Sequence, residues 1–193
     1  MHAATNQKGF TLIELIIVFS IMSILSTIGI ASFVTYSHSE AVDTTMKDIK
    51  TVLFTARSRA GSQLKQGTCA SSNLQLQGYE VLFCCTTNGC PTCYQPSQQT
   101  GQGDYQPNPD YEMNIVCANA DGSGATHEVV SSKKFAPNIS FVSGVQTTAT
   151  SFFFQSVTGA VTTNNTSANP SEVAISGYGI TKMATVSASG VVQ

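Results

Sequence analysis

The hydrophobic positions divide the chain into a long apolar run, an amphipathic stretch and a series of short alternating segments. From Leu15 to Val34, 20 residues carry no ionisable group. At about 1.5 Å of rise per residue, a helix of this length crosses a hydrocarbon core of roughly 30 Å. Lys8 precedes the run and favours a cytoplasmic location for that end, which predicts that the rest of the chain lies outside.

Past this run, apolar residues recur at alternating spacings of four and three, which is the pattern of one face of an amphipathic helix. The residues of this stripe are Val42, Met46, Ile49, Leu53, Ala56 and Ala60. The pattern predicts one helix from about residue 10 to about residue 62, with Gly61 and Gly67 as stop signals. We expect Met46 and Phe54 to pack in the core against a sheet.

Charged residues on the same helix suggest one local ion pair. Asp43 and Lys47 are four residues apart, with the acid on the N-terminal side. This is the favoured orientation for a pair along a helix surface, so the sequence predicts that they interact.

After the helix the period of the pattern changes towards two, which is typical of strands. The predicted strands are Tyr79–Cys84, Tyr111–Ala118, His127–Phe135, Ile139–Val142, Ser151–Val157, Glu172–Ser176 and Ile180–Val186. Asp121-Gly122-Ser123-Gly124 predicts a hairpin connection. A helix followed by consecutive short strands indicates an α+β fold with an antiparallel sheet. The polar segments 94–110 and 160–171 are predicted to be loops.

The composition narrows the classes of function. Charged residues make up only 10% of the chain and the net charge is -2, so no polyanionic partner is indicated. Lys133 and Lys134 are the only adjacent basic pair. Nucleic-acid binding needs a basic cluster, so no nucleic acid is expected as a partner.

Six cysteines lie between Cys69 and Cys117, and an even number in one polar region suggests disulfides formed in an oxidising compartment. The cysteines are Cys69, Cys84, Cys85, Cys90, Cys93 and Cys117. Bridges from the adjacent pair to the C-x-x-C pair, and from the first cysteine to the last, are one plausible pairing among 15. Only one C-x-x-C occurs and no histidine lies near it, which favours disulfides over zinc. A loop follows the C-x-x-C, which argues against a redox motif.

The aspartates and histidines, which could bind a metal or act in catalysis, do not form a recognisable metal-binding or catalytic motif. Asp104, Asp110 and Asp121 lack the dense spacing of a calcium loop and are interpreted as acids in solvated turns. The three histidines are scattered along the sequence. We therefore expect no enzymatic activity, no metal and no cofactor.

Glu14 is the exception, because it is the only acid between Met1 and Glu40 and it lies at the start of the apolar run. A carboxylate within a membrane costs about 2.5–3.5 kcal/mol on insertion scales. Cleavage before Phe10 would create an α-ammonium four residues from Glu14, on the same helix face. That ammonium would pair with Glu14 of the same chain or of a neighbour. Alternatively, Glu14 lies at the membrane interface and interacts with the helix dipole.

The residues around Glu14 carry a family resemblance. Residues 8–15 read KGFTLIEL, which resembles the cleavage and methylation signature of type IV prepilins and of type II secretion pseudopilins. The resemblance implies that a prepilin peptidase cuts between Gly9 and Phe10, that the new amine of Phe10 is methylated, and that Phe10 and Glu14 set the register of assembly. Many members have a proline where this chain has Ala31, so the kink that proline causes is not predicted.

The resemblance also implies the pilin fold and the following organisation. Residues 1–9 would be the leader peptide, 10–37 the transmembrane and assembly helix, 38–65 the amphipathic half of that helix, and 66–193 a disulfide-containing, β-rich globular domain. Residues 53–60, LFTARSRA, and the tail ending in Ser189-Gly190-Val191-Val192 are similar to the GspH and FimT group of pseudopilins.

The expected function is that of a structural subunit, a minor pilin or pseudopilin of a type IV pilus or type II secretion-like filament. The chain would begin as a single-pass protein of the bacterial inner membrane, with its globular domain extracytoplasmic. Its expected partners are membrane lipid, the peptidase, the inner-membrane assembly platform and other pilin subunits. The alternatives are a tip-displayed adhesin using the loop around residues 84–110, a membrane-anchored redox or metal protein and, less favoured, a DNA-uptake minor pilin.

Overall fold

A computed structural model describes residues 10–71, 73–83, 109–142, 150–163 and 171–193. The chain divides into two compact units, residues 1–39 and 40–193. In the first unit the described residues form the N-terminal part of helix α1 (Leu12–Gly61). The second unit holds the rest of that helix and all of the described strands.

The predicted long helix is confirmed, since α1 covers 50 residues and ends at Gly61. All six residues of the predicted apolar stripe are buried, with exposed fractions between 0% and 6%. Met46 is buried as expected, but the prediction for Phe54 is wrong. Phe54 is 63% exposed while Leu53, one position earlier, is 0% exposed. Successive residues are about 100° apart around a helix, and the sheets cover the side that carries Leu53.

The end of α1 also differs in part from the prediction. Gln63 adopts a φ of 54° just past the helix, which is the left-handed conformation common at helix C-termini. Gly67 does not stop α1. It has a φ of 56° and is the first residue of a second, five-residue helix, α2 (Gly67–Ser71). The predicted partner of Asp43 is wrong as well, because its carboxylate lies 3.0 Å from Nζ of Lys182 on β8 (Ile180–Val186).

Eight described strands confirm the α+β class and form two antiparallel sheets. The remaining strands are β1 (Gln75–Phe83), β2 (Tyr111–Ala118), β3 (Thr126–Lys133), β4 (Ile139–Phe141), β5 (Ser151–Gln155), β6 (Val161–Thr163) and β7 (Ser171–Gly177). The larger sheet has the order β3-β2-β1-β5-β6 and the smaller one has the order β4-β7-β8. Every predicted strand coincides with an observed one, with differences at the ends.

Those differences have local causes. β3 ends before Phe135, whose N–H donates to the Asp110 carboxylate over 2.8 Å instead of joining the sheet. β5 ends before Val157, which has a φ of 72° in a turn. The predicted loop 160–171 contains β6, which pairs with β5 through Phe152↔Thr163 and Phe154↔Val161. Thr and Val have high strand propensity, and an available sheet edge let this short polar segment pair.

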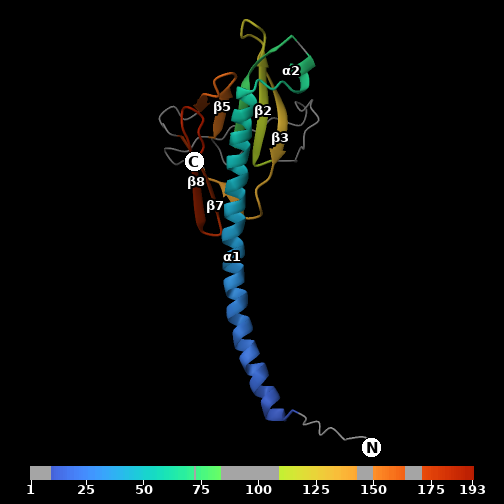
Figure 1. Ribbon diagram of the computed structural model, residues 1–193, viewed down its shortest axis with the longest axis vertical. Helices are drawn as coiled ribbons and strands as arrows, with labels where there is room; N and C mark the ends of the chain where they lie inside the picture. The colour runs from blue at the N-terminus through green and yellow to red at the C-terminus, as the bar shows by residue number, and fades with distance from the viewer. Residues whose placement is uncertain (1–9, 72, 84–108, 143–149, 164–170) are drawn as a thin grey trace, which may run out of the picture. The chain divides into compact units, whose positions relative to one another are not determined.

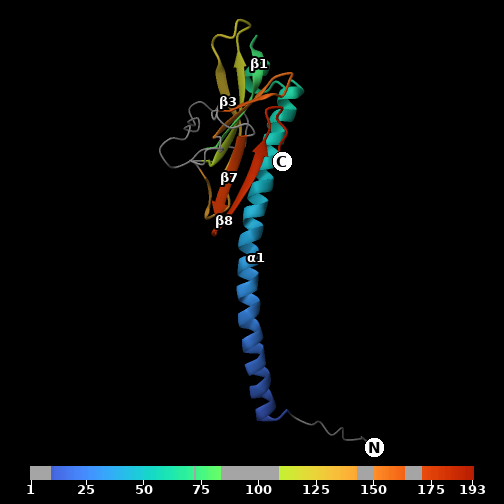
Figure 2. The ribbon, with the colours of Figure 1, turned by 90° about the vertical axis from the view of Figure 1, so that its left-hand side faces the viewer.

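The core of the second unit lies between α1 and both sheets. Figures 1 and 2 show that the part of α1 in the second unit runs alongside both sheets. The larger sheet includes β1, β2 and β3, and the smaller sheet includes β7 and β8. Phe83 of β1 stacks on Phe141 of β4 with ring centroids 5.5 Å apart, and meets Phe152 of β5 edge to face. These aromatic contacts join the two sheets into one core beneath the helix.

Candidate functional site

The first turn of α1 is capped by its own sequence. The N–H of Glu14 donates to Oγ1 of Thr11 over 3.3 Å, and the N–H of Leu15 donates to the Thr11 carbonyl over 3.2 Å. Thr11 is therefore the N-cap and Glu14 the third helical residue, which is the spacing of a capping box. A carboxylate in this turn also interacts favourably with the positive end of the helix dipole.

Hydroxyl groups inside the apolar run are satisfied within the helix. The side chains of Ser20, Ser23, Ser26 and Thr27 each donate to the backbone carbonyl four residues earlier, over 2.7–2.9 Å. A hydroxyl without a partner is costly in hydrocarbon, and these bonds remove that cost. By length and composition α1 is able to cross a membrane, with a mean hydropathy of 2.3 in its apolar window.

The large apolar side chains of this run are not buried by any described residue of the first unit. Phe10 is 82% exposed and Phe33 is 71% exposed, and the intervening large apolar residues are also exposed. None of the candidate membrane-spanning window is buried. A polar cap at the start, internally bonded hydroxyls and an apolar surface on all sides are what a helix in lipid requires.

Residues 4–30 match the prokaryotic N-terminal methylation motif. The motif marks the chain as type IV pilin-like. This pilin-like chain thus fits a membrane-anchored precursor, and the motif implies processing by a prepilin peptidase and assembly with other pilin subunits. The family is one of structural rather than catalytic proteins. No solved structure matches the chain.

The residues that the sequence singled out at the N-terminus lie together in the motif. Gly9 is outside the described residues, Phe10 is the first described residue, and Glu14 follows one turn later on an exposed part of α1. The matched segment contains all three. In the pilin-like chain, the predicted cleavage site therefore adjoins a helix whose first turn is already capped by Thr11.

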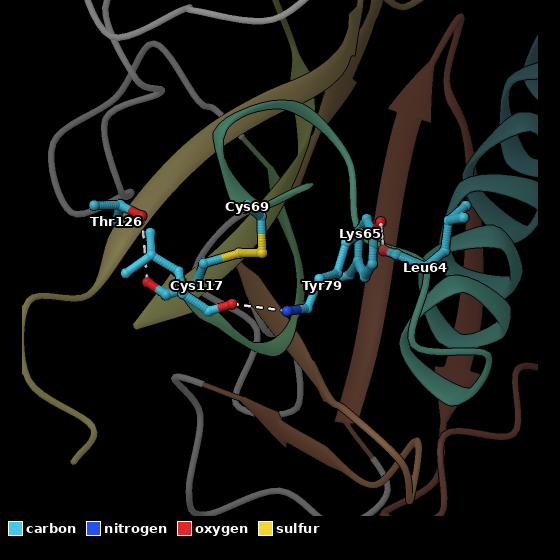
Figure 3. Close-up of a disulfide and its surroundings, with 7 residues drawn as sticks. Leu64, Lys65, Cys69, Tyr79, Cys117 and Thr126 are labelled. Atoms are coloured by element: carbon cyan, nitrogen blue, oxygen red, sulfur yellow. Dashed lines mark hydrogen bonds between the residues drawn. A yellow bond between two sulfur atoms is a disulfide. The ribbon is translucent and has the colours of Figure 1, made fainter. Parts of the chain in front are cut away.

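The structure shows one disulfide among the described cysteines of the second unit. Cys69 on α2 is bonded to Cys117 on β2, one of the pairings considered from the sequence (Figure 3). The bond lies at a buried position, with both residues 2% exposed. Cys84, Cys85, Cys90 and Cys93 lie outside the described residues, as does most of the predicted loop 94–110.

Further bonds hold the segment between α1 and the larger sheet. The Tyr79 hydroxyl of β1 donates to the Leu64 carbonyl over 2.6 Å (Figure 3). Nζ of Lys65 donates to the Leu74 carbonyl over 2.8 Å. Burial raises the pKa of Tyr79, and the nearby Arg59 charge opposes that effect in part. The disulfide and these bonds together fix the end of α1 against the sheet.

The predicted turn acids have structural roles. Asp121 accepts bonds from the backbone N–H and the hydroxyl of Ser123, over 2.9 and 2.7 Å, and these bonds lower its pKa. The turn connects β2 and β3, which pair antiparallel, so the predicted hairpin is confirmed. Asp110 holds the backbone of Phe135, and Asp104 lies outside the described residues.

Sequence reasoning missed two arrangements. The first is the Thr11 cap, for which the T-x-x-E spacing before an apolar run was an available signal. The second is a polar group on the sheet face away from α1, where Glu80 lies 3.3 Å from Nδ1 of His127 and accepts a bond from Ser151 over 2.9 Å. These residues come from β1, β3 and β5, so only strand pairing brings them together.

Proposed function

We propose that this chain is a structural filament subunit, a minor pilin or pseudopilin, that is cut between Gly9 and Phe10 and assembled through its N-terminal helix. The observation that carries the proposal is the KGFTLIEL segment within the matched methylation motif, directly before a helix able to cross a membrane. The chain is held in the inner membrane before assembly, with its β-rich unit outside the cytoplasm.

The electrostatics of the first turn support this assignment. Cleavage converts the N–H of Phe10 into an ammonium, one helical turn from the Glu14 carboxylate. In a low-dielectric setting two opposite charges attract far more strongly than in water. An ammonium that pairs with Glu14 of a neighbouring chain fixes the axial stagger of two packed helices. Glu14 thus acts as a positioning residue for assembly.

The Thr11 cap adds a supporting detail. Thr11 occupies the Glu14 N–H through its hydroxyl, and the helix geometry starts without help from Phe10. Removing the residues before Phe10 therefore leaves the start of the helix intact. The new amine of Phe10 is then available for methylation and for pairing with Glu14. The peptidase and an inner-membrane assembly platform are the partners that this sequence of events needs.

The test compares two variants in cells that contain the processing peptidase. Gly9→Val places a branched side chain at the cut site, and we expect an uncut precursor that stays in the inner membrane. Glu14→Ala keeps the cut site, and we expect normal cleavage with at least a tenfold loss of filament. Glu14→Gln is the matched control of similar size, and it should fail in the same way if charge is what matters.

The readouts are the mass of the mature N-terminus and the amount of chain in sheared filaments. Cleavage alone gives the mass of a chain that begins at Phe10. Methylation of the new amine adds the mass of one methylene group to that value. Recovery of the uncut N-terminus from cells with active peptidase would contradict the cleavage step. Normal filaments from Glu14→Ala would contradict the role of Glu14 in register.

A further inference from the structure

The two-residue turn between β7 and β8 has an unusual sequence for its conformation. It consists of Tyr178 and Gly179, which have φ values of 54° and 77°. Such turns favour asparagine, aspartate and glycine, because a bulky side chain is strained in the left-handed region. The Tyr178 hydroxyl donates to the Pro137 carbonyl over 2.9 Å, yet Tyr178 is still 38% exposed. Strained residues often have a functional role, so the position of this turn in the unit is informative.

The turn lies at the end of the second unit where α1 enters it. Lys182 on β8 pairs with Asp43 over 3.0 Å, and later in the chain a Cβ on Gly190 would lie 3.1 Å from the Arg57 side chain. β8 therefore runs in the same direction as α1 (Figures 1 and 2). The turn ends three residues before Lys182, about 10 Å away along the strand. Glu40, the first residue of the unit, is only about 4.5 Å before Asp43 along the helix, so the turn projects past Glu40.

This end of the unit is also the end that the chain holds close to the membrane. The apolar run stops at Val34, six residues before Glu40. Six helical residues rise about 9 Å, and the headgroup layer on each side of the hydrocarbon core is about 5–7.5 Å thick. Even fully extended, six residues span no more than about 22 Å. The connection therefore keeps the Glu40 end, and the turn that projects past it, near the bilayer surface.

The chemistry of this end suits the headgroup layer. Residues 136–138 read APN and residues 177–181 read GYGIT, so neither segment contains a charged group. Charged side chains on this part of the unit carry both signs, which gives no strong preference for an anionic lipid. They are Glu40, Asp43, Asp48, Lys134 and Lys182. Tyrosine is enriched at membrane interfaces, where its ring contacts apolar groups and its hydroxyl has polar partners.

We propose that the Tyr178-Gly179 turn rests in the headgroup layer of the membrane while the precursor is held there before assembly. The partner is a lipid surface with neutral headgroups, and Tyr178 is the residue that meets it. The inference rests on the proposed function, because that function places the apolar helix in a bilayer. It adds that the β-rich unit is docked on the bilayer surface at a defined turn.

The test uses tryptophan fluorescence, because the chain contains no tryptophan of its own. Full-length variants are inserted into phosphatidylcholine vesicles that contain either a headgroup-nitroxide lipid or a lipid brominated in its acyl chains. Thr181→Trp, at an exposed position beside the turn, keeps Tyr178 and should lose about half of its emission to the headgroup nitroxide. Phe54→Trp is the matched control, exposed on α1 about 21 Å past Glu40, and should lose less than about a tenth.

A second pair of variants tests the part that Tyr178 plays. In the Thr181→Trp chain, Tyr178→Asn introduces a residue that this turn conformation favours, so the fold is retained. We expect quenching by the headgroup nitroxide to fall at least about threefold, because asparagine has no preference for the interface. Tyr178→Phe keeps the ring and should stay within about twofold of the Thr181→Trp chain. Equal quenching in the Tyr178→Asn variant would overturn the assignment of the contact to Tyr178.

A reporter inside the apolar run separates the two proposals. Phe19→Trp should be quenched by the brominated acyl chains, which shows that the helix is inserted. Quenching of Phe19→Trp without quenching of Thr181→Trp would overturn the docking and leave the proposed function standing. An unquenched Phe19→Trp would overturn the membrane-held precursor together with the docking.

Two further outcomes would also overturn the docking. Equal quenching of Thr181→Trp and Phe54→Trp by the headgroup nitroxide would show adsorption of the unit without a defined contact. A blue-shifted Thr181→Trp emission that the nitroxide does not quench would assign the turn to a contact with protein instead of lipid.

Discussion

Cys69 and Cys117 are bonded to each other across 48 residues of sequence, with their Cα atoms 5.9 Å apart. The bond joins α2, which follows the long helix, to β2, which lies between β3 and β1 in the larger sheet. It therefore closes a long loop that contains β1 and the segment carrying the other four cysteines. This relationship ties the end of α1 to the sheet that covers it.

The first prediction concerns the loss of this bond. Cys69→Ser with Cys117→Ser should lower the free energy of unfolding by about 4 kcal/mol, because closing a loop of this length restricts the unfolded chain. Urea titration of detergent-solubilised protein measures the change. The single variant Cys69→Ser should lose a similar amount, since either change removes the bond. A loss below about 1 kcal/mol would show that other contacts already fix this segment.

A second prediction separates two neighbours on α1. Leu53→Ala should cost about 2–5 kcal/mol of folding stability because it leaves a cavity in the core. Phe54→Ala should change stability by no more than about 0.5 kcal/mol, since the ring is exposed. Thermal or urea unfolding of the two variants in the same detergent tests this. Equal losses would place Phe54 in the core after all.

A third prediction compares two glycines with positive φ. A Cβ on Gly67 would overlap with the Glu128 carboxylate, whereas Gly179 has open space around its Cβ position. Gly179→Ala should therefore cost only the backbone strain, about 1–2 kcal/mol. Gly67→Ala should cost more, because the buried Glu128 must also move. If unfolding measurements give equal costs, Glu128 relaxes freely.

A fourth prediction concerns alkaline pH. Burial, with a smaller contribution from the Asp48 charge, raises the pKa of Tyr111 from 10.0 to about 12. The folded state then retains a proton that the unfolded state has lost, so stability falls as pH rises from about 10 to about 12. Below pH 10 this contribution is constant. Tyr111→Phe should flatten the decline, measured by urea titrations across this range, while Tyr178→Phe, at a partly exposed position, serves as the control.

A decline that is unchanged in Tyr111→Phe would contradict this assignment. Burial raises the pKa of Tyr79 as well, so part of the slope should survive in the single variant. Adding Tyr79→Phe should flatten the decline further. It also removes the bond to the Leu64 carbonyl, which lowers stability at every pH and is therefore distinguishable from a change in slope.

The elements that the sequence determined are those whose signal lies within a few turns of chain. The apolar run Leu15–Val34 and the stripe from Val42 to Ala60 specify the helix, because residues three and four apart share a face. The KGFTLIEL segment specified the family, and the match over residues 4–30 agrees with it. Strand alternation and the Asp121-Gly122 turn likewise depend on adjacent residues, so both were predicted.

Tertiary structure alone decided how these elements meet. The sheets cover only one side of the helix, so Leu53 is buried and Phe54 is exposed. Asp43 met Lys182 of a distant strand instead of its neighbour Lys47, and the short segment Val161–Thr163 became a strand once β5 offered an edge. The physical reason is that packing and pairing depend on the positions of residues far apart in the chain, whereas periodicity reports only the nearest turns.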